Sequence, residues 1–451
     1  MKNEQQFQGK HVLVLGLAKS GEASSRLLHR LGGIVTVNDA KPIEENTQAK
    51  ELEKEGIKVI CGAHPLSLLD EPVDFIVKNP GIPYTNPIIK EAVTRGISVF
   101  TEIELASKLS DAEIISITGS NGKTTTTTLI VEMLENSGRT PLVAGNIGKV
   151  ACEVVQKASE DNIIVMEVSS FQLQGTETFH PRVAVLLNLY DAHLDYHGTK
   201  EAYGEAKGKM FANLTDEDYA VINKDSEMVM KLAANTKGKK IFFSVNEPLD
   251  EGVSIKDEKI YFNNEMIAPV SDVVLPGKHN LENILAAIAS AKLMGANNEQ
   301  IIHVIKTFSG VKHRLQFVTN VNERAFYNNS KATNITAAET AIFAFENPVV
   351  LLAGGLDRGN SFDEFIPALQ KVKAVITFGE TKNKIKEAAK EAGVSTIIET
   401  ENVQSAVPLA YDASREGDII LLSPACASWD QYKTFEERGD KFIEAIEALK
   451  S

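Results

Sequence analysis

A lysine and a threonine that follow a short glycine-containing loop are the residues of this chain best suited to phosphate chemistry. Lys123 can neutralise the terminal phosphates of a nucleotide, and the hydroxyl of Thr124 can bind Mg²⁺. The loop comes after the apolar run 114–117, which predicts a buried strand, and it opens an apolar helical segment. Its backbone N–H groups and the helix N-terminus would face the anion. The stretch consists of Thr118, Gly119, Ser120, Asn121, Gly122, Lys123, Thr124 and Thr125.

The spacing of this loop departs from the common Walker pattern, which has four residues between its glycines. Here only two residues separate Gly119 from Gly122, and the position of the first Walker glycine is Ile117. The alternative is a threonine-rich, N-capped helix without a ligand. Capping does not explain why Gly-Lys-Thr follows a strand, so the sequence favours a nucleotide-binding loop.

An acid and two histidines follow later strands. Glu167 ends the predicted strand 162–168, where a carboxylate near a phosphate loop can bind Mg²⁺; its alternative role is to cap the next helix. His193 lies in 191–197, which holds two Asp and two His residues whose spacing is not that of a structural zinc site. A hydrogen-bonding imidazole is the alternative there.

A helix is predicted over 203–211, and it carries Lys207 and Lys209. Composition alone gives Lys207 no role, and the residue pattern favours a solvated helix face.

The composition indicates a cytosolic chain of several domains. The length of 451 residues suggests two to four domains, and 43% hydrophobic residues suit sizeable cores. A net charge of −14 argues against a broad nucleic-acid-binding surface. Cys61, Cys152 and Cys426 are too far apart for a zinc ribbon or a disulfide framework. We expect no signal peptide and no membrane insertion, because the start is polar and no apolar run is long enough.

Strands and helices alternate through three α/β units, each with a mostly parallel sheet. We place the units at 1–100, 101–309 and 310–451. The first is Rossmann-like: a strand at 11–16 leads through a turn at 17–21 into a helix, and the next strand ends in Asp39. It lacks GxGxxG, so a nucleoside diphosphate suits it better than a dinucleotide. The central unit is of the phosphate-loop type, and the third is again Rossmann-like.

Further polar loops supply ligand-binding groups. Asn280 and Asn283 lie one turn apart on a helix, where they can either pair with adenine or cap the helix. In the third unit, polar segments follow several predicted strands, which suggests one ligand face. These segments are 312–314, 328–334, 354–359 and 423–431.

Together these motifs resemble the Mur ligase family, in order and over the whole chain. The general family signals are the phosphate loop, the Glu167 and His193 loops, Ala206-Lys207, His279-Asn280 with Asn283, and His313-Arg314. The segments 329–334, 423–428 and 435–439 are most similar to the members of the family that add D-glutamate.

The resemblance implies three domains that hold a UDP moiety, ATP and an incoming amino acid. It implies an ATP-dependent ligase that joins D-glutamate to UDP-N-acetylmuramoyl-L-alanine through an acyl phosphate, a cytoplasmic step of peptidoglycan precursor synthesis. The implied cofactors are two Mg²⁺ ions and a carbamylated lysine. Beyond these small molecules we expect no nucleic-acid or membrane partner, and we expect a monomer.

The resemblance also implies roles for single residues. Those for ATP are Gly119, Ser120, Asn121, Gly122, Lys123, Thr124, Thr125, Asn280, Asn283, Arg314 and Asp357. Those for the UDP substrate are Ser20, Asp39, Gly81 and Asn146. Those for D-glutamate are Lys331, Thr333, Ser428 and Phe435. The metal ligands are Thr124, Glu167, His193 and Lys207 as its carbamate; Lys123, His193 and Lys207 are the catalytic residues.

The chain departs from the family pattern at three positions. Asn329 stands where the family often has Asp, Lys19 replaces an apolar residue of the UDP pocket, and Trp429 stands where some members have Leu. Three alternative functions remain at this point. They are a family ligase with another acceptor, a nucleotide-binding regulator without turnover, and a Rossmann dehydrogenase, against which the missing GxGxxG counts.

Overall fold

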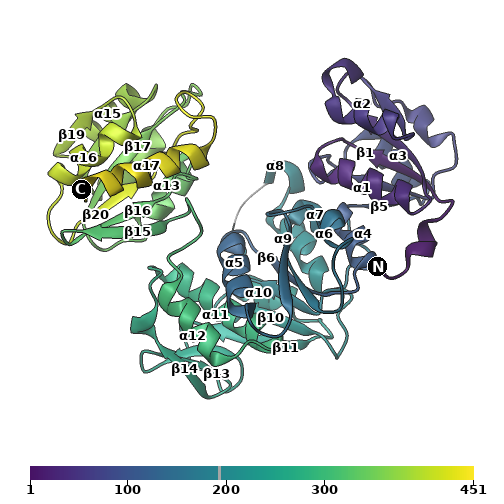
Figure 1. The fold of residues 1–451 in the computed structure, drawn as a ribbon, viewed down its shortest axis with the longest axis horizontal. Coiled ribbons are helices and arrows are strands. Elements are labelled where there is room, and N and C mark those ends of the chain that lie inside the picture. The colour runs from purple at the N-terminus through teal and green to yellow at the C-terminus, as the bar shows by residue number, and fades with distance from the viewer. Residues whose placement is uncertain (191–193, 451) are drawn as a thin grey trace. The chain divides into compact units, whose positions relative to one another are not determined.

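The structure, a computed structural model, describes residues 1–190 and 194–450. It contains two compact units: Met1–Asp272 with Glu282–Ile305, and Val273–Leu281 with Lys306–Ser451. The first unit holds two sheets and the second holds one (Figure 1). All three sheets are mostly parallel, which confirms the predicted α/β class. None of the helices in the described ranges combines the length and the apolar character needed to cross a membrane.

The N-terminal sheet has five parallel strands in the order β3-β2-β1-β4-β5. Its strands are β1 (His11–Leu15), β2 (Ile34–Asp39), β3 (Lys58–Cys61), β4 (Phe75–Lys78) and β5 (Ser98–Phe100). Its helices are η1 (Glu4–Phe7), α1 (Lys19–Arg30), η2 (Ile43–Glu45), α2 (Thr47–Lys54), η3 (Leu66–Leu69) and α3 (Pro87–Thr94). The predicted turn at 17–21 was wrong in its second half, because α1 already begins at Lys19.

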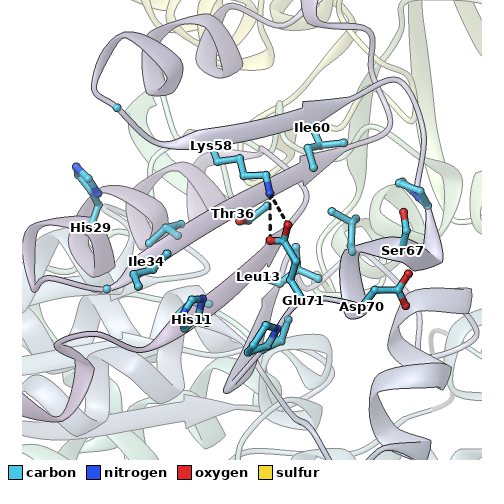
Figure 2. A pocket seen from close by; sticks show the side chains of 18 residues that line it. His11, Leu13, His29, Ile34, Thr36, Lys58, Ile60, Ser67, Asp70 and Glu71 are labelled. Carbon is cyan, nitrogen blue, oxygen red and sulfur yellow. Dashed lines mark hydrogen bonds and ion pairs between the residues drawn. The ribbon is translucent and has the colours of Figure 1, made fainter.

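Alternation along β1 explains how this sheet is covered. Val12 and Val14 join the core beneath α1 and α2, whereas Leu13 and Leu15 join the core beneath α3. On the α3 side the connection from β3 to β4 carries only the short η3. An open cavity of about 800 Å³ therefore remains over β1, β2 and β3, where Lys58 and Glu71 form an ion pair at 3.1 Å (Figure 2).

The central sheet has nine strands in the order β14-β13-β12-β11-β10-β9-β6-β8-β7. Only β12–β13 and β13–β14 are antiparallel pairs, so the antiparallel strands lie together at that edge of the sheet. The strands are β6 (Glu113–Thr118), β7 (Thr140–Gly145), β8 (Asn162–Glu167), β9 (Val183–Leu186), β10 (Tyr219–Asn223), β11 (Lys239–Ser244), β12 (Val253–Lys256), β13 (Lys259–Phe262) and β14 (Glu265–Pro269).

The helices around this sheet carry most of the candidate site. They are α4 (Glu102–Leu109), α5 (Lys123–Leu134), α6 (Ala151–Val154), α7 (Ser170–Gln174), α8 (Leu194–His197), α9 (Lys200–Gly208), η4 (Lys209–Phe211), α10 (Glu227–Leu232), η5 (Val270–Asp272), α11 (Lys278–Leu293) and α12 (Asn298–Thr307).

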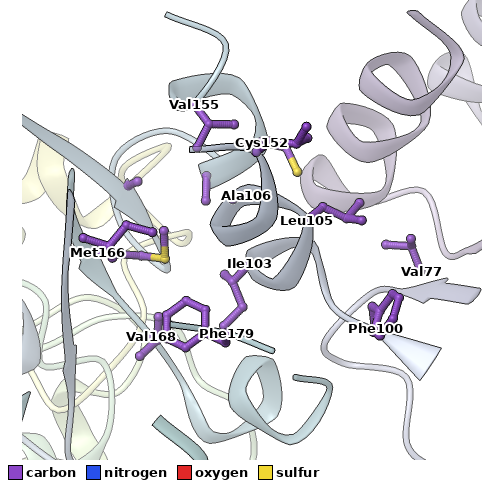
Figure 3. Packing of buried hydrophobic residues seen from close by; sticks show 14 of the residues in the cluster. Val77, Phe100, Ile103, Leu105, Ala106, Cys152, Val155, Met166, Val168 and Phe179 are labelled. Atoms are coloured by element: carbon purple, nitrogen blue, oxygen red, sulfur yellow. The ribbon is translucent and has the colours of Figure 1, made fainter. Parts of the chain in front are cut away.

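One continuous apolar cluster joins the two sheets of the first unit. It runs from Val77 and Phe100 through Leu105 on α4 to Met166 and Phe179 (Figure 3). Burial of this apolar surface stabilises the contact between the two sheets of the unit.

The second unit has six strands in the order β15-β16-β20-β17-β18-β19, and only β15–β16 is antiparallel. Residues of α13, α14 and α15 cover one face and residues of α16 and α17 cover the other, so the sheet is doubly wound. The strands are β15 (Gln316–Val321), β16 (Arg324–Asn328), β17 (Val349–Gly354), β18 (Val372–Phe378), β19 (Thr396–Glu399) and β20 (Ile419–Leu422). The helices are α13 (Ile335–Ile342), η6 (Asp363–Phe365), α14 (Ile366–Leu369), α15 (Lys382–Glu391), α16 (Val403–Ala413) and α17 (Phe435–Leu449).

A carboxylic acid is buried at the junction of the two sheets in the first unit. Glu102, the first residue of α4, accepts hydrogen bonds from the Cys152 N–H at 3.2 Å and from Gln172 Nε2 at 3.4 Å. Burial raises the pKa of Glu102 to about 7, because these neutral donors only partly replace water.

The raised pKa of Glu102 predicts a pH-dependent stability. The folded state retains the Glu102 proton up to about pH 7, whereas the unfolded chain releases it near its ordinary pKa of 4.5, so stability falls as pH rises between these values. Glu102→Gln should therefore gain about 2 kcal/mol relative to the wild type between about pH 5.5 and pH 8. Urea unfolding of both proteins at the two pH values measures this. An unchanged difference would show that Glu102 is ionised in the folded state.

Candidate functional site

The phosphate loop joins the end of β6 to the start of α5 at the carboxyl edge of the central sheet. Gly122 has a φ of +84°, and a Cβ atom there would lie 2.1 Å from Oδ1 of Asn283. Only glycine accommodates both the backbone conformation and this contact. Asn283 on α11 thus packs directly against the loop.

Three polar side chains converge on the loop. Lys123 Nζ donates to the carbonyls of Gly119 and Ser120, both at 2.9 Å, which holds its charge within the curve of the loop. Thr124 Oγ1 donates to Glu167 Oε2 at 2.8 Å. A nucleotide phosphate at the N-terminus of α5 would meet both this cation and the helix dipole.

Glu167 also binds Asn146, which follows β7. Asn146 Nδ2 donates to Glu167 Oε1 at 2.8 Å, and the Asn146 N–H donates to the carbonyl of Glu167 at 2.8 Å. The structure therefore brings Asn146, a predicted substrate-binding residue, to the carboxylate that also contacts Thr124.

The oxygen donors beside the loop suit Mg²⁺. That ion commonly takes one or two protein carboxylates and completes its shell with phosphate oxygens and water. The Glu167 carboxylate and the Thr124 hydroxyl fit this pattern. Among the residues that the structure describes, no three His, Cys, Asp or Glu side chains form a metal cluster. His193, which is predicted to bind the second of the two Mg²⁺ ions, lies outside the described residues.

Lys207 lies against the other side of the loop. Its side chain is buried, and Nζ donates to Thr118 Oγ1 at 3.1 Å and to the Gly119 carbonyl at 3.0 Å. Burial, with the neighbouring positive charge of Lys123, lowers the pKa of Lys207 well below its ordinary value. The solvated helix face predicted from the residue pattern was wrong for Lys207, because α9 packs this face onto the phosphate loop.

Residues that the sequence did not single out support the loop. Ser120 Oγ shares a hydrogen bond with the Tyr203 hydroxyl at 3.1 Å, and the Asn121 N–H donates to Asn188 Oδ1 at 2.9 Å. No motif marks Tyr203 or Asn188, since each acts across a gap of more than 60 residues in the chain.

Of the predicted substrate residues of the first domain, Asp39 lines a cavity of about 500 Å³, which Lys19 and Asn79 also help to line. Asp39 accepts hydrogen bonds from two backbone N–H groups, those of residues 17 and 41. Asn79 connects the other two predicted residues: its Nδ2 donates to Ser20 Oγ at 3.0 Å, and its Oδ1 accepts from the Gly81 N–H at 3.1 Å.

The second unit places its polar loops at the carboxyl edge of its own sheet. Thr333, Asp357, Arg358 and Cys426 help to line a cavity of about 200 Å³. Asp357 accepts from Lys384 Nζ at 2.9 Å and from the N–H of residue 359, and these contacts lower its pKa.

Arg438 fastens these loops together. Its fully buried guanidinium donates to the carbonyls of Ser330 at 2.8 Å, Cys426 at 3.0 Å and Gly354 at 3.3 Å. The Ser330 hydroxyl in turn donates to the Phe435 carbonyl at 2.7 Å. One side chain thus sets the spacing of three loops and the start of α17.

Three of the predicted D-glutamate residues lie at these loops. Lys331 Nζ lies 5.1 Å from the centroid of the Phe435 ring, and the Thr333 N–H donates to the Lys331 carbonyl at 2.9 Å. The fourth, Ser428, is buried, and its hydroxyl has no hydrogen-bond partner in the described part of the chain. A buried hydroxyl without a partner is costly unless a ligand binds it.

The remaining ATP residues predicted from the sequence are Asn280 and Arg314. Asn280 is buried at the start of α11, where Nδ2 donates to the Pro276 carbonyl at 2.6 Å. Arg314 precedes β15, and its N–H donates to the Val311 carbonyl at 2.8 Å.

Models of known protein families match three segments of the chain, one for each sheet. The N-terminal domain of MurD-like Mur ligases matches residues 10–101, the Mur ligase middle domain matches residues 117–291, and the glutamate ligase domain of Mur ligases matches residues 313–426. The chain belongs to the Mur ligase family. A relative from Halalkalibacterium halodurans is 62% identical and one from Geobacillus kaustophilus 58%, with all of each chain covered. Both are named UDP-N-acetylmuramoylalanine–D-glutamate ligase.

Solved structures of the family share the fold. MurC from Thermotoga maritima has a TM-score of 0.57 at 19% identity, covering 97% of this chain and 99% of its own. MurF from Thermotoga maritima, in complex with ADP, also has a TM-score of 0.57, at 15% identity, covering 100% of this chain and 98% of its own.

Proposed function

We propose that this chain joins D-glutamate to UDP-N-acetylmuramoyl-L-alanine at the expense of ATP, as its relatives' names indicate. One observation carries the proposal from the structure. Lys123, Thr124 and Glu167 converge at a helix N-terminus, which is the arrangement that phosphoryl transfer requires. The domains 1–100, 101–309 and 310–451 would hold the UDP moiety, ATP and the amino acid.

The first chemical step is transfer of the γ-phosphoryl group to the alanyl carboxylate. A carboxylate oxygen attacks phosphorus, the bond to ADP breaks, and an acyl phosphate forms. Lys123 would neutralise charge on the transferred group, while Asn146 beside Glu167 would orient the acceptor. Bound Mg²⁺, held by Thr124, Glu167, His193 and carbamylated Lys207, would neutralise phosphate charge.

The second step forms the amide. The neutral amine of D-glutamate attacks the acyl carbon, loses a proton, and phosphate leaves. Lys331 would bind a carboxylate of D-glutamate, and Thr333, Ser428 and the backbone at Phe435 would donate hydrogen bonds to its carboxylates. Asn280, Asn283, Arg314 and Asp357 would contact ATP. Ser20, Asp39 and Gly81 would bind the UDP moiety.

We further propose that the enzyme acts as a monomer in the cytosol. Another family ligase with a different acceptor is the nearest alternative, and the acceptor assays below distinguish the two.

Carbamylation of Lys207 would explain a lysine buried beside Lys123. The free amine adds CO₂ and loses a proton, which replaces an unfavourable cation with an anion for Mg²⁺. Lys207→Met should lower kcat at least about a hundred-fold, and formate or acetate should restore part of it. Lys209→Met is the control, because Lys209 is exposed and donates to the carbonyls of Gln174 and Thr176 rather than to the phosphate loop. Normal turnover by Lys207→Met would contradict the role.

Acceptor choice should depend on the Ser428 hydroxyl. Loss of a hydrogen bond to a charged group costs about 1.5–3 kcal/mol, so Ser428→Ala should raise the KM for D-glutamate about ten- to a hundred-fold. The KM values for ATP and the UDP substrate should change little. Thr377→Val is a matched control, because Thr377 Oγ1 in β18 is also buried without a partner in the described ranges.

The assay is ADP formation with UDP-N-acetylmuramoyl-L-alanine and D-glutamate, L-glutamate or a diamino acid. The wild type should use D-glutamate in preference to L-glutamate, because inversion of the α-carbon misplaces the amine or a carboxylate. Preference for another acceptor would overturn the proposed function. A defect that is equal in Ser428→Ala and Thr377→Val would overturn the pocket assignment.

A further inference from the structure

A lysine is buried behind the loop that forms one wall of the UDP-substrate cavity. Lys78, the last residue of β4, is 1% exposed, and Nζ donates to the carbonyls of Pro80 at 3.2 Å and Ile82 at 2.9 Å. No described carboxylate lies within ion-pair distance of it, and burial lowers its pKa to about 7. Burial of an amine costs free energy, and its hydrogen bonds to the two carbonyls offset that cost.

The same two carbonyls bind a residue from the central domain. Tyr196 on α8 directs its hydroxyl to the carbonyls of Pro80 at 3.3 Å and Ile82 at 3.2 Å, and Lys78 Nζ lies 3.3 Å from that hydroxyl. The Tyr196 ring packs edge-on against Phe171 on α7, with centroids 4.5 Å apart. These carbonyls of the loop are therefore held by Lys78 of the first domain and by Tyr196 of the central domain.

The other side of this loop faces the cavity of about 500 Å³. Asn79 and Ile82 line that cavity, and Asn79 also binds Ser20 and the N–H of Gly81. A shift of the Pro80 and Ile82 carbonyls would therefore move the cavity wall.

Aromatic contacts continue from Tyr196 to the phosphate loop. Tyr196 and His197 have ring centroids 5.0 Å apart, and those of His197 and Tyr203 are 5.4 Å apart. The Tyr203 hydroxyl then contacts Ser120 Oγ at 3.1 Å. Packed side chains thus connect the wall of the substrate cavity with the phosphate loop.

We propose that Lys78 and Tyr196 are positioning residues for the UDP substrate: together they hold segment 79–83 in the shape that the substrate requires, and they make that shape dependent on docking of the central domain. The inference rests on the proposed function, because it assigns the cavity of about 500 Å³ to the UDP moiety.

The test is calorimetric binding of UDP-N-acetylmuramoyl-L-alanine and of a non-hydrolysable ATP analogue to the full chain. Lys78→Met and Tyr196→Phe should each weaken binding of the UDP substrate about ten-fold and leave that of the analogue within about two-fold. The double variant should lose less than the product of the two single effects, because both residues bind the same carbonyls. Lys58→Met is the matched control: Lys58 is on the same sheet, but exposed and paired with Glu71 (Figure 2).

Three results would overturn the inference: unchanged binding of the UDP substrate by Lys78→Met, equal weakening of both ligands, or loss of affinity by Lys58→Met. If Lys78→Met fails to fold, binding of the UDP substrate by Tyr196→Phe provides the test, because this change removes only a hydroxyl. Wild-type turnover with D-glutamate tests the proposed function separately, since the binding comparison among the variants does not require turnover.

Discussion

The candidate site in the first unit depends on one buried carboxylate. Glu167 is 1% exposed, and its two carboxylate oxygens accept hydrogen bonds from the neutral donors Thr124 and Asn146. Burial of a charge is costly without compensation, so this arrangement favours a bound cation and the cationic end of a phosphate loop. The position of Glu167 also requires glycine at residue 145, because a Cβ atom there would lie 2.3 Å from the Glu167 carbonyl oxygen.

The fold supplies this constraint by placing strand ends together. β6 and β8 are adjacent parallel strands, so the phosphate loop and Glu167 emerge at one edge of the sheet. In the second unit, polar loops also meet at the carboxyl edge of the sheet, where a buried arginine holds them together. Arg438 binds three backbone carbonyls there, and its contacts position the loops that carry Lys331 and Ser428.

The sequence predicted the parts of the molecule that depend on local pattern. Alternation of apolar strands and helices predicted three α/β units, and the residues from Gly119 to Thr124 predicted a loop between a strand and a helix, which is where the structure has one. The residue pattern did not reveal the burial of Lys207, because lysine is rarely buried. Tyr203 and Phe211, four residues before and after it, are both buried and lie on the same side of the segment. The closeness of Lys207 to Thr118 arises from packing across 89 residues.

Lys78 and Arg438 show why other parts could not be predicted. Both are charged residues that bind backbone carbonyls, and any residue type supplies a carbonyl. The partners of Arg438 come from loops as far as 108 residues away. No residue pattern therefore marks either contact, although both side chains are among the largest fully buried ones.

In the proposed mechanism, the γ-phosphoryl group of ATP passes to the alanyl carboxylate before the amine of D-glutamate attacks. The direct test uses UDP-N-acetylmuramoyl-L-alanine labelled with ¹⁸O in that carboxylate and mass analysis of the phosphate released. One labelled oxygen is expected in each phosphate, because the attacking oxygen leaves with phosphorus when the amine displaces it. Release of unlabelled phosphate during amide formation would contradict an acyl-phosphate mechanism.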